Sequence, residues 1–200
     1  MARTLSNFGV PLDTAGTGTG ILQPKLNYRF RVIVTGFGGI TAQTGPQEFT
    51  RQVMNVTRPK VTHESIPVDS YNSRMYMMGK HTWEPITITL RDDISNRLTK
   101  LVGSQLQTQL DHRSQLGPQA GSDYKFSTLI EILNGNDGAA IEQWQLEGCF
   151  VQNADYSQSD YAVSDPVTIA LTLQYDNATF NDETIMPSIG QRNNANSGLG

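Results

Sequence analysis

Two glycine-rich stretches are the first residues in this sequence whose types could support chemistry. Residues 16–20 (GTGTG) and 36–39 (GFGG) could each present bare backbone amides to a phosphate group. A phosphate-binding loop is followed directly by a helix and by a Lys-Ser/Thr pair, and neither stretch has these. We therefore predict an irregular arm for the first stretch and a strand-ending turn for the second.

The histidines and the single cysteine are the next candidates. His63, His81 and His112 have no short spacing to one another or to Cys149, so they form no zinc-binding pattern. Cys149 falls inside a predicted strand, which favours the role of a small buried hydrophobic residue. A nucleophilic Cys149 assisted by a remote histidine is the enzymatic alternative.

The aspartates offer no better site. Asp155, Asp160 and Asp165 recur every five residues, a spacing that fits neither a calcium loop nor one face of a helix. Asp92 and Asp93 precede a predicted helix, where negative charge stabilises the helix N-terminus. We predict no catalytic residue, no metal site and no cofactor, and we expect the protein not to be an enzyme.

The elements that position these residues are mostly strands. Alternating apolar and polar side chains predict strands over residues 27–35, 49–57, 86–91, 125–134, 142–151 and 167–175, the last of these being the final core strand. The predicted inward residues are Tyr28, Phe30, Val32 and Val34 in the first strand and Trp144, Leu146, Gly148 and Phe150 in the fifth. One helix is predicted over residues 94–113, with Gln105 and Gln109 away from its apolar face.

A long hairpin-like loop over residues 58–80 interrupts this pattern. Residues 75–78 (MYMM) place contiguous apolar area on the projecting loop. Exposed apolar patches of this kind usually mark a binding surface on soluble proteins. We therefore expect the loop to contact a partner.

Charge is unevenly distributed along the chain. Residues 1–100 hold 12 Lys/Arg and 7 Asp/Glu, a net charge of +5, whereas residues 101–200 hold 3 and 12, a net charge of −9. If the two halves formed different faces, copies of the chain would attract one another. Alternatively, the halves interleave in the fold and the asymmetry vanishes.

Composition also indicates in which cellular compartment the protein is made and which partners it does not bind. The single cysteine cannot form an internal disulfide, and no apolar run approaches the ~20 residues of a membrane helix. The N-terminus lacks the apolar core of a signal peptide, so we expect cytoplasmic synthesis and no membrane anchor. The acidic balance argues against a specific nucleic-acid binder.

Several segments together resemble the tail tube protein of contractile-tailed bacteriophages. They are NYRFRVIV (27–34), V-x-x-x-S-IPV (61–68), Gly79 and Trp83 before PITITLRDD (85–93), the helix that follows, LEGCFVQNADY (146–156) and PVTIALTLQYD (166–176). The resemblance covers roughly residues 25–177. It implies a mainly β domain over 25–177, an antiparallel β-sandwich or split barrel with one flanking α-helix and a long projecting hairpin loop, between a flexible arm (1–24) and a C-terminal extension (178–200).

The resemblance also implies a role and partners. Subunits of this family, which are similar to those of R-type bacteriocin and type VI secretion tubes, form hexameric rings that stack into the inner tail tube, the conduit for genome ejection. The implied partners are further copies of the chain, the tail sheath protein, and baseplate and tube-terminator proteins, with DNA passing through the lumen without specific binding. The implied location is the virion tail, assembled in the host cytoplasm.

Two sets of residues follow from this resemblance. The loop that reaches an adjacent ring maps to residues 63–79, and the expected contacts are His63, Glu64, Ile66, Pro67, Tyr71, Arg74, Met75, Tyr76 and Met77. Polar strand residues with few basic neighbours are expected to line the lumen, namely Thr87, Thr89, Thr168, Thr172 and Gln174.

Two non-enzymatic alternatives stay open. A baseplate tube-initiator or tube-capping protein would share the fold but form a single ring. A carbohydrate-binding β-sandwich would require Trp83 and Trp144 to be exposed, whereas we expect both in the core.

Overall fold

A computed structural model describes residues 25–39, 46–134, 138–162 and 164–181 of the chain. The predicted N-terminal arm and residues 182–200 lie outside the described residues. In chain order the elements are β1 (Phe30–Thr35), η1 (Phe37–Gly39), α1 (Pro46–Gln52), β2 (Val53–Val56), β3 (Lys60–Ser70), β4 (Ser73–Glu84), β5 (Ile86–Arg91), α2 (Arg97–Gln109), η2 (Gly121–Asp123), β6 (Phe126–Leu133), β7 (Ala140–Asp155), β8 (Thr168–Gln174) and β9 (Asn177–Asn181).

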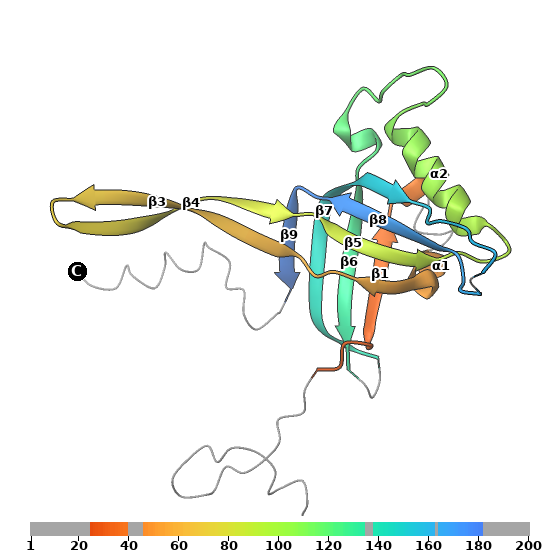
Figure 1. Cartoon of the computed structure of the whole chain (residues 1–200), viewed down its shortest axis with the longest axis horizontal. Helices are drawn as coiled ribbons and strands as arrows, with labels where there is room; N and C mark the ends of the chain where they lie inside the picture. The colour runs from red at the N-terminus through yellow and green to blue at the C-terminus, as the bar shows by residue number, and fades with distance from the viewer. Residues whose placement is uncertain (1–24, 40–45, 135–137, 163, 182–200) are drawn as a thin grey trace, which may run out of the picture.

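Two antiparallel sheets share the long strand β7 (Figure 1). Its first part pairs with β6 on one side and β9 on the other, and β6 also pairs with β1. Its last part pairs with β8, which continues through β5 to β2. Strands β1 and β2 end the two sheets and do not pair with each other, so the barrel is not closed. This arrangement confirms the predicted antiparallel, mainly β fold.

Strands with strict alternation form the core, as predicted. The inward residues of β5 and β8 are buried, and those of β1 and β6 meet them from the other sheet. Each Å² of apolar surface that these side chains remove from water stabilises the fold by about 25 cal/mol. The buried apolar residues of these four strands are Val32, Val34, Ile86, Ile88, Leu90, Phe126, Ile130, Ile132, Ile169, Leu171 and Leu173.

The predicted strand over residues 49–57 is wrong in its first half, because α1 ends only at Gln52. Phe49 lies on this helix, fully buried, with its ring edge-on to Phe37 at 5.4 Å between centroids. Phe49 and Val53 are four residues apart, a spacing that fits one helix face as well as it fits a strand. Tyr28 is also misplaced by the sequence, since it precedes β1 and is exposed.

Strand β7 changes its inward face at Gly148, which the sequence did not predict. Leu146 is buried before this glycine, but Cys149 and Val151 are buried after it and Phe150 is only half-buried. Gly148 has a φ of 67°, and a Cβ there would lie 2.2 Å from a carboxylate oxygen of Asp176. A left-handed glycine in a strand is typical of a bulge, which bends the strand between two sheets.

Helix α2 is shorter than predicted and its buried face includes a glutamine. The helix covers Arg97–Gln109 rather than residues 94–113, and Ile94 is fully exposed before it. Gln105 is 1% exposed: its amide donates to the Tyr124 carbonyl at 2.7 Å and its oxygen accepts from Gly38 N at 2.8 Å. The prediction that Gln105 lies away from the apolar face is therefore wrong.

Strand β9 follows the strand that the sequence predicted to be the last of the core. It places residues 178–181 in the sheet rather than in a C-terminal extension, with Phe180 packed on Trp144 at 4.9 Å between centroids. The strands of the basic and acidic halves of the chain are mixed in both sheets. The alternative in which the two halves of the chain interleave is therefore the one that the sheets show.

Candidate self-assembly surface

The hairpin formed by β3 and β4 projects away from the two sheets (Figure 1). Its strands pair from Lys60↔Glu84 to Ser70↔Ser73, and Tyr71 and Asn72 form the turn. Eleven residues of β3 at about 3.3 Å per residue give the hairpin a length of about 36 Å. The sequence predicted this projecting element and its approximate bounds.

The outer half of the hairpin has one continuous apolar face. Ile66 pairs with Met77 and Val68 pairs with Met75, which places these four side chains on the same side. The other side carries the pairs Ser65↔Met78, Pro67↔Tyr76 and Asp69↔Arg74. Ile66, Met75 and Met77 are each about half exposed, at 45%, 59% and 58%.

This arrangement refines the predicted contact set. Of its residues, only Ile66, Met75 and Met77 share the apolar face, whereas Pro67, Arg74 and Tyr76 share the opposite one. Tyr71 is at the turn and fully exposed. The sequence did not predict Val68, which completes the apolar face. The role of all these residues in contacts between rings stays a prediction.

The tip of the hairpin is held by an ion pair. Arg74 Nε lies 2.6 Å from Asp69 Oδ1, and this hydrogen bond raises the pKa of Arg74. Both side chains are largely exposed, so the pair contributes little to stability. Asp69 and Arg74 are directly opposite each other beside the turn, so the pair is consistent with the strand register there.

The base of the hairpin connects to the core through aromatic side chains. Trp83 packs on the buried Tyr175 at 5.8 Å between ring centroids, and His81 lies edge-on to Trp83 at 6.2 Å. On the opposite face of the hairpin, Lys60 Nζ pairs with a Glu84 carboxylate oxygen at 2.9 Å. The hairpin thus leaves the core from a packed base.

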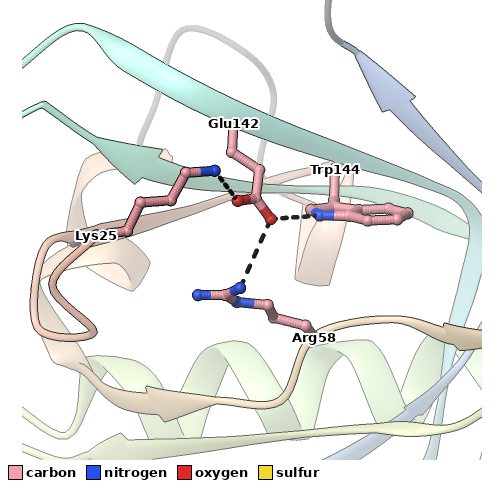
Figure 2. A network of polar contacts seen from close by, with 4 residues as sticks. All are labelled: Lys25, Arg58, Glu142 and Trp144. Carbon is pink, nitrogen blue, oxygen red and sulfur yellow. Dashed lines mark hydrogen bonds and ion pairs between the residues drawn. The ribbon is translucent and has the colours of Figure 1, made fainter. Parts of the chain in front are cut away.

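A buried glutamate ties the hairpin base to β7 (Figure 2). Glu142 Oε2 pairs with Lys25 Nζ at 2.8 Å, and its Oε1 accepts from Trp144 Nε1 at 2.9 Å and lies 3.8 Å from Arg58 Nη1. Arg58 precedes β3 by two residues. The cluster therefore joins the chain before β1, the strand β7 and the segment that enters the hairpin. No local sequence pattern predicts this cluster, because Lys25, Arg58 and Glu142 are far apart in the chain and meet only through the topology.

The charge of Glu142 is stabilised in the folded protein. Burial works to raise its pKa, but the hydrogen bonds from Lys25 and Trp144 and the positive charges of Lys25 and Arg58 together hold the pKa below its ordinary value. A carboxylate with a lowered pKa stabilises the fold above its unfolded pKa of about 4.3, and this contribution is lost as the pH falls through the lower folded value.

Replacing Glu142→Gln should therefore change both stability and its dependence on pH. At pH 7 we expect the free energy of unfolding to fall by about 1–3 kcal/mol, because charged hydrogen bonds are lost. Below about pH 4.3 the variant should lose less further stability than the wild type. Urea unfolding midpoints between pH 7 and pH 3 measure this, and parallel curves for the two proteins would contradict it.

The predicted lumen residues lie together on the outer face of β5 and β8. Thr87 pairs directly with Thr172, and Thr89 pairs with Ala170. Thr168 pairs with Arg91, and Gln174 with Phe150 of β7. The five predicted residues are half-buried and uncharged, but Arg91 adds an exposed positive charge to this face. Their position on a channel wall stays a prediction.

A groove of about 860 Å³ lies between β1 and β2, the end strands of the two sheets. Its lining is largely apolar and includes Phe30, Val32, Val53, Met54, Val56, Ile130 and Ile132, with Arg31 and Arg58 among the polar residues. The sequence could not predict the groove, because β1 and β2 approach each other only in the folded chain.

Cys149 is poorly suited to nucleophilic chemistry. It is fully buried, and burial raises the pKa of its thiol to about 11. A thiol with this pKa is protonated at neutral pH, and the thiolate is the nucleophile. Within the described residues, no three His, Cys, Asp or Glu side chains gather as metal ligands.

The two tryptophans form no exposed aromatic platform. Trp83 and Trp144 are partly buried against the core, where they pack on Tyr175 and Phe180 with tilted rings. The carbohydrate-binding alternative therefore loses the feature on which it depended. None of the helices in the described part of the chain is long and apolar enough to span a membrane.

Known structures resemble this arrangement over most of its length. The tube-terminating cap of the anti-feeding prophage matches with a TM-score of 0.61 and 15% identity, over 85% of this chain and 98% of the cap protein. A chain from the sheath-tube complex of the PVC extracellular contractile injection system matches with a TM-score of 0.56 and 17% identity, over 79% of this chain and 91% of that chain. The SPP1 tail tube protein matches with a TM-score of 0.53 and 12% identity, over 79% of each chain.

The chain has the tail-tube fold. No family model matches the sequence, and no curated protein matches it. The resemblance inferred from the sequence is thus confirmed at the level of the fold, at identities that show the fold alone. Tail tube, cap and sheath-tube components of these assemblies all appear among the matched structures.

Proposed function

We propose that this protein is the subunit of the inner tail tube of a contractile tail. Its copies form hexameric rings, and the rings stack into a tube surrounded by the sheath. Baseplate and tube-terminator proteins bound the tube at its two ends. The role is structural rather than enzymatic, the location is the virion tail, and assembly takes place in the host cytoplasm.

The projecting hairpin carries the proposal. Its apolar face has no partner among the described residues of its own chain, since the hairpin forms a separate two-stranded sheet away from the body. A protruding element that binds a different surface of an identical chain makes a heterologous contact, and such contacts generate rings or stacked assemblies. The tail-tube fold supports the same outcome, and the match to a chain of a sheath-tube complex supports the sheath as partner.

Size-exclusion chromatography with negative-stain microscopy of the purified full chain tests the proposal. We expect rings or hollow tubes with sixfold symmetry. A protein that stays monomeric at high concentration, with its hairpin protected by its own body in hydrogen exchange, would overturn it.

The outer face of β5 and β8 is proposed to line the lumen, where DNA passes without specific binding. Thr87 and Thr172 face each other in the centre of this surface. Their neutral hydroxyl groups do not retain phosphates, whereas lysine would.

Replacing Thr87→Lys with Thr172→Lys should slow genome ejection while leaving tube assembly intact. The double variant adds two positive charges per subunit, twelve in each proposed ring, and ejection should slow most at low salt, where phosphate contacts are strongest. Ejection kinetics from particles carrying the variant measure this, with Thr87→Ser and Thr172→Ser as the matched control. Unaltered ejection at low salt would remove these residues from the lumen wall.

A tube cap or baseplate initiator is the second candidate. The anti-feeding prophage cap matches the chain as closely as the sheath-tube component does, so the fold does not separate the two roles. Growth of the purified protein into long tubes supports the tube subunit, whereas rings that do not stack support the cap or initiator.

A further inference from the structure

Two histidines face each other across the base of the hairpin. His63 and His81 are directly opposite in the pairing of β3 and β4, and both are exposed. Their ring centroids are 6.1 Å apart with the ring planes tilted by 52°. The spacing of the two histidines in the sequence did not predict this pair, because they are brought together only by the register of the hairpin.

The separation of the rings suits a shared metal ion. An imidazole nitrogen binds a divalent transition metal at about 2.0–2.1 Å, which puts the ion about 3.2 Å from the ring centroid. Two rings on one ion can therefore have centroids up to about 6.4 Å apart. The observed distance falls within this limit, and small side-chain rotations close it further for a bent geometry.

The surroundings of the pair also permit a cation. Val61 and Trp83 share the histidine face of the hairpin, and neither is charged. The ion pair of Lys60 with Glu84 lies on the opposite face and is internally neutralised, with its charged atoms 2.9 Å apart. Glu64 and Lys80, which flank the histidines at the irregular step of the hairpin, contribute one charge of each sign.

We propose that His63 and His81 form a two-histidine binding site for a divalent transition metal. Imidazole suits Cu²⁺, Ni²⁺ and Zn²⁺, and affinity should be highest for Cu²⁺. Water completes the coordination, since the described residues supply no third ligand. A bound ion ties β3 to β4 beside the irregular step and stiffens the base of the hairpin. The proposal does not depend on the tube role.

Titration of the unassembled, tag-free full chain with Cu²⁺ at pH 7.5 tests the site. The ring centroids of Trp83 and His81 are 6.2 Å apart, so metal binding should quench the fluorescence of Trp83 in a saturable way. Calorimetry should give one ion per chain. His63→Ala and His81→Ala should each weaken binding at least about tenfold, since loss of a ligand costs at least as much as loss of a supporting group. His112→Ala, the third histidine of the chain, is the matched control and should bind as the wild type does.

Quenching that does not saturate, or that survives in either single histidine variant, would overturn the proposal. If the variants misfold, electron paramagnetic resonance of the wild type with one equivalent of Cu²⁺ decides the question. Two coupled imidazole nitrogens support the site, whereas one or none overturns it.

Discussion

A chain carrying Met75→Asp together with Met77→Asp is expected to stay folded and to form no tubes. Both methionines are more than half exposed and lie on the apolar face of the hairpin, so the substitutions leave the core untouched. In the proposed tube that face would be covered, and two carboxylates would lose their water without gaining a partner. The cost is on the order of 3 kcal/mol or more at each contact, and it recurs in every subunit.

Sedimentation and negative-stain microscopy measure the assembly, and circular dichroism checks the fold. The matched control is Ile94→Asp with Leu116→Asp, which adds the same charge at two exposed apolar residues outside the hairpin. The control should still assemble. Long tubes from the methionine variant would discard the assigned role of the hairpin, and loss of assembly in both variants would show that added charge alone is responsible.

The second large effect is expected from Gly38→Ala. Gly38 has a φ of 58°, and a Cβ there would lie 2.7 Å from the carbonyl oxygen of Leu101 in α2. Backbone at this distance cannot rotate away, so the helix would have to move, which would also disturb the hydrogen bond from Gly38 N to Gln105. Left-handed backbone and overpacking together should lower the free energy of unfolding by about 2–4 kcal/mol.

Gly103→Ala on the facing helix is the matched comparison, and its effect should have the opposite sign. A Cβ at Gly103 meets no atom within 4 Å, and alanine is favoured over glycine inside a helix by about 1 kcal/mol. Urea unfolding of both variants measures the two changes. Equal effects would show that the contact between Gly38 and α2 does not constrain the fold.

The sequence predicted the strands whose inward and outward residues alternate without interruption. The predictions were wrong where a bulge or a helical turn interrupts that alternation. Gly148 reverses the inward face of β7 through a bulge that no composition signal marks, and Phe49 belongs to a helix because its contact with Phe37 outweighs a weak strand pattern. Strand β9 was missed because asparagines surround its two packing residues, Ala178 and Phe180.

The candidate site was predictable in part for the same reason. The apolar run over residues 75–78 predicted an apolar projection. Which of its side chains share a face, however, depends on the register of β3 and β4. Buried polar residues were the least predictable. Gln105 and Glu142 are buried because specific donors and acceptors meet them in space, and a sequence does not show those partners.

Gln109 has a consequence for how sheets of neighbouring molecules can join. Its side-chain amide donates to the Val151 carbonyl and accepts from the Val151 amide, each at 2.9 Å, along the edge of β7 beyond the end of β6. The glutamine thus occupies the backbone groups that an incoming strand would need. Edge-to-edge fusion of two chains at this position is blocked, which protects newly made protein against unordered aggregates. Among the described residues, the outer edges of β2 and β9 pair with no further strand and can accept an ordered partner.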